Sequence, residues 1–531
     1  MPRRYWWLPG GITAGLLLAV GLGPLIALLS QAPLAATPLW QDPYLRQVVI
    51  FSLGQAALST GLSLLLALPV SRALHRRRFA GRSLLLKLFG LSQVLPVIIA
   101  LFGLVAVHGH GGWLARLLSS LGLSLPQYLY GLSGIVLAHL FFNVPLAARW
   151  WLQSLERLPA NQWRLAEQLG LASWSLFHHL EWPALRAQLP ALAGLIFMLC
   201  FTSFATVMAL GGGPGATTLE VAIYQALRYD FDLQAAGQLA LWQLLLSGLI
   251  LLLHHRWPSE PPQLKVSDHY RRQDGARLGA RLHDGASLAL VALLYLPPLL
   301  AILLSGLRPE LWRALASPRL WHSTGQSLLI GTLAASLALG LTLLLLISSR
   351  HLRLRLGRRH WAQGLESLGN LILVLPSAVL STGLFILLMP FTDVFGLGLY
   401  LVVLINALAS LPYTLRTLQP AMEAVAHRYD RLADSLGLAG LARLTRLEWP
   451  LLRPALGRAF ALAMILSLGD LGAIALFGSG ELQTLPWLLY QQLGSYRLNE
   501  AAATALLLLA LCLALLGILE RGIGGKDADC R

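Results

Sequence analysis

Charged side chains are scarce in this sequence. Of its 531 residues only 12% are Asp, Glu, Lys or Arg, while 56% are hydrophobic. Soluble domains carry roughly 25% charged residues, and a single hydrophobic core stops growing at about 250–300 residues. The scarcity of charge excludes a soluble enzyme, and the high hydrophobic content excludes a disordered chain. A polytopic membrane protein remains, with the lipid bilayer as its first partner.

Lysine and cysteine are also rare. Lys87, Lys265 and Lys526 are the only lysines, and no G-x-x-x-x-G-K-[ST] loop occurs, so ATP is not expected to bind in the P-loop manner. The three cysteines form neither a C-x-x-C pair nor a Cys/His zinc spacing. No catalytic constellation is found in the sequence. We therefore predict no cofactor, no metal site and no enzymatic activity on this chain.

Basic residues outnumber acidic ones, 40 to 24. A basic chain can bind nucleic acid, but basic residues also collect in the cytoplasmic loops of membrane proteins. With the N-terminus inside, 33 of the 40 fall on the inner side. The seven on the outer side are Arg46, Arg116, Arg228, Arg308, Arg313, Arg319 and Arg497. This alternation predicts that both termini are cytoplasmic and that no nucleic acid binds.

Apolar runs of a length that crosses a bilayer, about 17–25 residues, recur along the chain. Twelve are predicted, at 10–30, 48–70, 88–107, 131–150, 188–210, 235–253, 286–305, 324–347, 368–389, 397–415, 456–478 and 501–519. The first is longer than the core of a signal peptide, so we expect a retained anchor. The fold predicted is an all-α polytopic membrane protein with about twelve transmembrane helices.

Two segments repeat at a constant offset of 267 residues. They read RLAEQLGLASWSLFHHLEWP at 164–183 and RLADSLGLAGLARLTRLEWP at 431–450. A second match, Leu95-Pro96 with Leu375-Pro376, lies at an offset of 280. The chain therefore reads as two homologous halves of six spans each.

The most similar stretches fall in cytoplasmic loops, which usually vary. Arg164 to Leu169 is expected to form a helix, Gly170 a left-handed turn, and residues 173–181 a second short helix that ends before Pro183. Such a helix–turn–helix would offer one contact per half to a cytoplasmic partner. The alternative is duplicated packing that carries no function.

These loops resemble the EAA motif of ABC importer permeases, E-A-A-x3-G-x9-I-x-L-P. The matching positions are Ala166, Gly170, Pro183, Ala433, Gly437 and Pro450, and Leu180 and Leu447 replace the motif's Ile. Arg164 and Arg431 stand where the motif has Glu, Leu165 and Leu432 replace its first Ala, and Trp182 and Trp449 replace its Leu. Two such loops on one chain resemble the fused type I permeases, which implies the type I ABC importer transmembrane fold.

Stretches such as AHLFFNVPLAARWWLQSLE and TLPWLLYQQLGSYR are similar to the thiamine permeases within that family. The resemblance implies import of thiamine, and its phosphate esters, across the bacterial inner membrane. It also implies two copies of a cytoplasmic ABC ATPase and a periplasmic thiamine-binding protein as partners. The alternatives are the same machine with ferric iron or another small solute as its cargo, or a secondary transporter.

The resemblance and the repeat together divide the chain into five parts. These are an N-terminal anchor and outer loop (1–46), a first permease repeat (47–254), a linker with the seventh span and an outer loop (255–321), a second repeat (322–520) and a cytoplasmic tail (521–531).

Two groups of candidate site residues follow. The ATPase-coupling group is Ala166, Glu167, Gly170, Glu181, Pro183, Ala433, Asp434, Gly437, Glu448 and Pro450. The possible translocation path holds Asp470, Asn143 and Asn406. A charge at mid-bilayer is costly, so Asp470 is expected to face a partner or water. The alternative for all three polar residues is a hydrogen bond between helices.

Overall fold

The structure is a computed structural model. It describes residues 8–31, 41–124, 126–171, 174–255, 278–307, 309–354, 356–370, 375–438 and 440–523. Within these ranges the chain is helical and contains no strand, which confirms the predicted all-α fold. Residues 256–277, at the start of the expected linker, and residues 524–531 of the expected tail lie outside the described residues.

The helices group into two compact units. Unit 1 comprises residues 1–37, 222–244 and 308–531, and unit 2 comprises residues 38–221 and 245–307. Unit 2 contains α2 (Pro43–Arg76), α3 (Arg82–Leu91), α4 (Val97–His108), α5 (Trp113–Ser120), α6 (Leu132–Glu156), α7 (Ala160–Gln168), α8 (Trp174–Leu176), α9 (Trp182–Arg186), α10 (Leu189–Phe201), α11 (Phe204–Leu210) and α14 (Leu278–Gly306).

Unit 1 contains α1 (Leu8–Gln31), α15 (Glu310–Leu315), α16 (Pro318–Leu354), α17 (Arg359–Asn370), α18 (Ser377–Leu388), α19 (Gly398–Ser435), α20 (Gly440–Arg443), α21 (Trp449–Leu468), α22 (Gly472–Phe477), α23 (Leu485–Gly494) and α24 (Leu498–Ile523). The remaining helices, α12 (Leu219–Arg228) and α13 (Leu233–His255), contribute residues to both units.

Among the described residues, ten helices are long and apolar enough to cross a membrane. An eleventh candidate is a broken span, in which Trp174–Arg186 and Leu189–Phe201 meet at an angle of 55°. The shorter apolar helix α18 lies within the predicted run 368–389. The twelve predicted runs thus correspond to the ten candidate spans, the broken span and one short helix.

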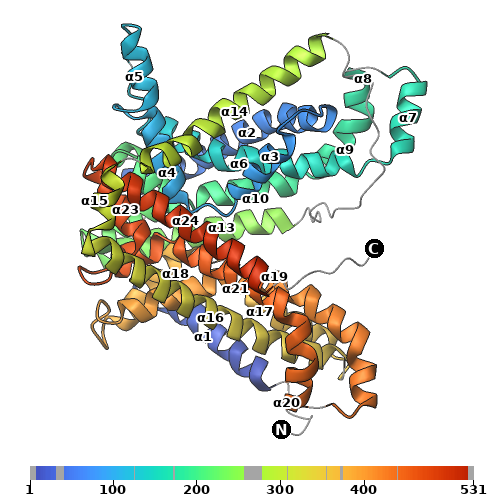
Figure 1. Ribbon diagram of the computed structural model, residues 1–531. Helices are drawn as coiled ribbons and strands as arrows, with labels where there is room; N and C mark the ends of the chain where they lie inside the picture. The colour runs from blue at the N-terminus through green and yellow to red at the C-terminus, as the bar shows by residue number, and fades with distance from the viewer. Residues whose placement is uncertain are drawn as a thin grey trace. The chain divides into compact units, whose positions relative to one another are not determined.

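The two units are built around the same arrangement of three helices. In unit 2, α2 packs against α6 and α10, and in unit 1, α16 packs against α19 and α21 (Figure 1). A serine hydroxyl on the first helix accepts a backbone N–H in each unit. The Ser52 Oγ accepts from Leu219 at 3.0 Å, and the Ser327 Oγ accepts from Leu485 at 2.7 Å. The sequence repeat is therefore also a repeat of packing.

The first span of each half packs on the core of the other half. α14 lies against α4 and α2 in unit 2, while α1 lies against α18 and α16 in unit 1. A glycine permits each close approach. A Cβ placed on Gly103 would lie 2.6 Å from the carbonyl oxygen of Pro298, and one on Gly383 would lie 2.6 Å from that of Pro24. Each unit thus combines a core from one repeat with the first span of the other.

Gly103→Ala and Gly383→Ala test this packing. The added methyl group would meet backbone, which cannot rotate away, so we expect the free energy of unfolding to fall by about 1–3 kcal/mol. The measurement is the thermal unfolding midpoint of the purified chain in detergent. Gly54→Ala is the matched control because a Cβ there meets no atom within 4 Å. Midpoints equal to that of the control would contradict the close approach.

Candidate functional site

The repeated segments, here called the first loop (164–183) and the second loop (431–450), share one turn. Gly170 has φ +65° and Gly437 has φ +63°. Just beyond each glycine, a backbone N–H returns to the carbonyl oxygen of a buried alanine. Leu171 donates to Ala166 and Leu438 donates to Ala433, both at 2.9 Å. This is the hydrogen bond by which a left-handed residue ends a helix, and the predicted left-handed turn is confirmed.

The sequence predicted that the second short helix ends before Pro183. This prediction is wrong, because the helix continues through Pro183. In the first loop α8 passes into a π-helical turn, Phe177–Glu181, which leads directly into α9 with Pro183 inside it. The second loop repeats this path, with a π-helical turn at Leu444–Glu448 followed by α21. Proline has no N–H to continue the hydrogen bonds of an ordinary helix. A single π-helical turn inside an α-helix changes the spacing of these hydrogen bonds by one residue.

The glutamate before each Trp-Pro pair is buried and bonded to an arginine at the end of a long helix. Glu181 accepts a hydrogen bond from the Arg72 Nε at 2.5 Å, and Glu448 accepts one from the Arg350 Nη2 at 2.6 Å. Arg72 lies near the end of α2, and Arg350 near the end of α16. Each loop is therefore fastened to the long helix, α2 or α16, of its own unit's three-helix core, here called the central helix.

The two arginines were not anticipated from the sequence. A buried carboxylate needs a partner, but nothing in the loop itself says where that partner lies. The available signal was the position of Arg72 and Arg350, each a few residues beyond an apolar run and 278 residues apart. Read as a pair, they would have indicated matched cations at the same end of two equivalent spans.

Each loop makes one contact with the residue that directly precedes it, and this contact is apolar for the first loop and ionic for the second. Before the first loop, Trp163 packs with Leu176 and Ala166 in a small hydrophobic cluster. At the offset of 267, the equivalent positions are Asp430 and Arg443, which form an ion pair. Arg443 also donates to Glu448 at 2.8 Å. The same two helical segments are thus joined by different chemistry.

Electrostatics in the second loop favour the charged form of this arginine. Burial alone would lower the pKa of Arg443, but its hydrogen bonds to Glu448 and Asp430 raise the pKa above its ordinary value. In the described part of the second loop, Glu448 is therefore held between two cations, Arg350 and Arg443. In the first loop, Arg72 pairs with Glu181 as Arg350 pairs with Glu448.

The outward sides of both loops expose leucine at matching positions. The exposed fraction is 55% for Leu165 and 51% for Leu432, and 66% for Leu169 and 64% for Leu436. Trp174 in the first loop and Trp449 in the second are also exposed. Each loop thus combines buried anchoring residues with exposed leucines, which no element among the described residues covers.

The structure places most of the other predicted coupling residues in the same loops. Ala166 and Ala433 are buried at 5% and 1% exposure. Glu167 is partly buried in α7, and the side chain of Asp434 lies outside the described residues. Pro183 and Pro450 follow the π-helical turns. Their assignment to ATPase coupling stays a prediction at this point.

The predicted path residues lie at helix contacts inside their own units. The amide nitrogen of Asn143 donates to the Cys200 sulfur at 3.2 Å, and that of Asn406 donates to the Ser467 hydroxyl at 2.9 Å. Cys200 and Ser467 are again 267 residues apart. Both bonds join the second and third helices of the three-helix core.

Asp470 occupies the break between α21 and α22. Its carboxylate accepts backbone N–H groups of Gly472 at 3.3 Å and Ala473 at 3.1 Å, so it caps the start of α22. The role of Asp470, Asn143 and Asn406 in a translocation path stays a prediction. No group of three or more His, Cys, Asp or Glu side chains suited to a metal occurs among the residues that the structure describes.

Exchanging the ionic contact for the apolar one tests the equivalence of the loops. Asp430→Trp or Arg443→Leu alone should lower the free energy of unfolding by about 1–3 kcal/mol. The first removes one of the two carboxylates that Arg443 binds, and the second leaves Asp430 without its cation. The double variant rebuilds the contact of the first loop and should recover to within about 1 kcal/mol of the parent chain.

Thermal unfolding midpoints of the four chains in detergent measure the coupling between the two substitutions. Arg446→Leu, on an exposed position of the same segment, serves as the control for loss of a charge. Additive losses in the double variant would argue against the equivalence.

The chain is similar to known transport proteins. A family model described as "Binding-protein-dependent transport system inner membrane component" matches residues 355–523. The chain is 46% identical to the thiamine transport system permease protein ThiP of Escherichia coli (strain K12), over 97% of this chain and 96% of that protein. The ThiP protein of Haemophilus influenzae is 42% identical over 92% of this chain and 90% of its own length.

A sulfate transport system permease protein, CysW of Synechococcus elongatus, is 26% identical over 40% of this chain and 73% of its own length. The full-length similarity lies with the thiamine permeases. The chain belongs to the family of binding-protein-dependent transport system inner membrane components, within its group of thiamine transport system permease proteins.

Proposed function

We propose that this chain is the translocating subunit of an ATP-driven importer that carries thiamine, and its phosphate esters, from periplasm to cytoplasm. The observation that carries the proposal is the pair of matched loops, each with buried anchoring residues and exposed leucines. Membership of the family supports the transport role. A periplasmic binding protein delivers the cargo, and ATPase subunits supply the energy.

The two loops are the docking sites for the ATPase. A duplicated surface fits two copies of one ATPase, or a two-fold ATPase dimer. The exposed leucines provide the apolar contact, while the Arg72–Glu181 and Arg350–Glu448 pairs transmit the movement to α2 and α16. These helices have 34 and 37 residues and are therefore about 50–55 Å long, enough to carry a displacement across the bilayer.

The membrane orientation follows from the same assignment. ATPase subunits are cytoplasmic, so the loops face inward, as the distribution of basic residues predicts. Both termini then lie in the cytoplasm. The opposite ends of α2 and α16 face the periplasm, where the binding protein docks.

Selectivity for the cargo is shared with the binding protein. A pore needs weak contacts, because a tightly held solute would not leave. Thiamine is a cation, and the carboxylate of Asp470 at the break of its span is suited to a transient contact. Asn143 and Asn406 are the further polar groups that we assign to the path.

Leu169→Asp combined with Leu436→Asp tests the docking faces. A carboxylate at each apolar contact should reduce association with the ATPase at least about tenfold, because a desolvated charge would be unpaired in the interface. The measurement is co-purification of the tagged permease with its ATPase in detergent. Leu123→Asp is the matched control, since Leu123 is also an exposed leucine but lies outside both loops. Undiminished association in the double variant would reject the leucines as the docking contact.

Uptake by the reconstituted system tests the function itself. The permease, its ATPase and its binding protein are placed in liposomes with labelled thiamine, with and without ATP. We expect accumulation that needs ATP and that is lost in a chain whose first loop is replaced by a Gly/Ser linker. ATP hydrolysis stimulated by the binding protein without movement of thiamine would reject the cargo. Uptake driven by an ion gradient without an ATPase would reject the coupling role of the loops.

A further inference from the structure

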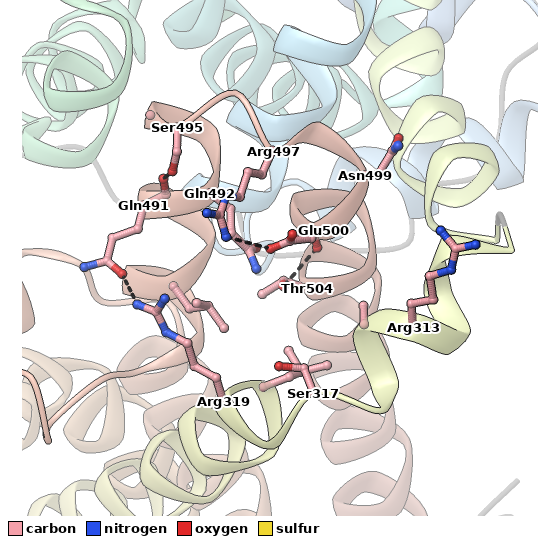
Figure 2. Close-up of a pocket in the computed structure, with 14 residues that line it drawn as sticks. Arg313, Ser317, Arg319, Gln491, Gln492, Ser495, Arg497, Asn499, Glu500 and Thr504 are labelled. Carbon is pink, nitrogen blue, oxygen red and sulfur yellow. Dashed lines mark hydrogen bonds and ion pairs between the residues drawn. The ribbon is translucent and has the colours of Figure 1, made fainter.

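A cavity of about 860 Å³ lies in unit 1, at the end of α16 that is far from the second loop. Its walls come from α15, the start of α16, the end of α23 and the start of α24 (Figure 2). The second loop is fastened to Arg350, near the other end of α16. The cavity and the loop are therefore separated by most of the length of this helix.

The lining of the cavity is rich in arginine. Arg313, Arg319 and Arg497 line it, against a single acidic residue, Glu500. These are three of the seven basic residues that the sequence assigns to the outer side. Few basic residues are assigned to that side, so the positive charge of the outer side is concentrated around this cavity.

Neutral groups hold one of these guanidinium groups in place. The Arg319 Nε donates to the Gln483 amide oxygen at 3.0 Å. Its Nη2 donates to the Gln491 amide oxygen at 2.6 Å (Figure 2). Amide oxygens orient the guanidinium without neutralising its charge. Arg497 lies 3.7 Å from Glu500, and both side chains are more than half exposed, so water screens this pair strongly.

The depth of the arginines matches that of lipid headgroups. Arg319 precedes the apolar run 324–347 by five residues, and Arg497 precedes the run 501–519 by four. At 1.5 Å per helical residue, both lie about 6–8 Å beyond the apolar core. The headgroup layer on each side of a bilayer is about 5–8 Å thick. The guanidinium groups are thus placed at the level of the lipid phosphates.

Exposed aromatic residues mark the same level. Trp312 and Trp321 are 74% and 53% exposed, and Tyr496 is 75% exposed. Each is next to a lining residue in the sequence. Trp and Tyr are enriched where a protein crosses the membrane–water boundary. Tyr496 has φ +57°, an uncommon conformation for a residue with a side chain, and it directly precedes Arg497.

We propose that this cavity binds the phosphate group of an anionic membrane lipid, with Arg319 and Arg497 as its principal contacts. Guanidinium groups bind phosphate oxygens through paired, charge-assisted hydrogen bonds. The amide-held Arg319 is preorganised for such a contact, and Arg497 completes it from the neighbouring helix. The proposal is independent of the cargo and of the coupling loops.

The test is native mass spectrometry of the purified full chain, titrated with phosphatidylglycerol in a neutral detergent. Arg319→Gln combined with Arg497→Gln should weaken lipid binding about tenfold, because two charge-assisted contacts are lost. Arg46→Gln combined with Arg116→Gln is the matched control. It removes two arginines assigned to the same side of the membrane but outside the cavity, and its lipid binding should be unchanged.

Further arms separate the sources of the anion. Phosphatidylglycerol should bind the parent chain more tightly than inorganic phosphate does, and equal occupancy by inorganic phosphate would overturn the assignment to a lipid. Arg319→Lys keeps the positive charge but lacks the paired N–H groups of the guanidinium. It replaces the glutamine variant as the test if that variant fails to fold. It should bind about two- to threefold more weakly, and wild-type affinity would count against the proposal.

A protein ligand would give a different pattern. Unchanged lipid binding in the glutamine variant, with weaker association of the periplasmic binding protein, would identify a docking face for that protein and would reject the lipid site.

Discussion

A carboxylate that is removed from water must be matched by a cation, and each loop meets this requirement at the end of its unit's central helix. Glu181 with Arg72 and Glu448 with Arg350 are the contacts on which the rest of the site depends. Because both partners are largely withdrawn from solvent, separating them is far more costly than breaking a surface pair. The pair therefore fastens each loop, with its exposed leucines, to the end of that helix.

The duplication preserved this geometry more strictly than its chemistry. The left-handed glycine, the π-helical turn and the glutamate–arginine pair occur in both loops. The contact with the residue that precedes each loop differs: it is the apolar pair Trp163 and Leu176 for the first loop and the ion pair Asp430 and Arg443 for the second. Burying apolar area and pairing charges can join two helices about equally well, so either solution satisfies the packing. Two loops with one shape can thus differ in their sensitivity to salt.

Much of the fold was predictable because a bilayer forces long apolar runs on any chain that crosses it. The loops were predictable because Gly170 and Gly437 repeat at one offset and their left-handed turn is a local property. Arg72 and Arg350 were not, since a partner about 100 residues away leaves no local signal. The continuation of the helix through Pro183 was missed because a π turn depends on the register of the backbone hydrogen bonds. The exchange of α1 and α14 was missed because hydropathy does not report which helix packs on which.

That exchange has a consequence for biosynthesis. Residues 32–317 separate the end of α1 from the start of α16, against which α1 packs. At about 5–20 residues per second, this partner emerges roughly 15–60 s after α1 has been made. The α4 face that carries Gly103 must likewise wait for α14. Neither unit can be completed until synthesis has passed the middle of the chain, so the early helices must be held in the membrane without their final neighbours.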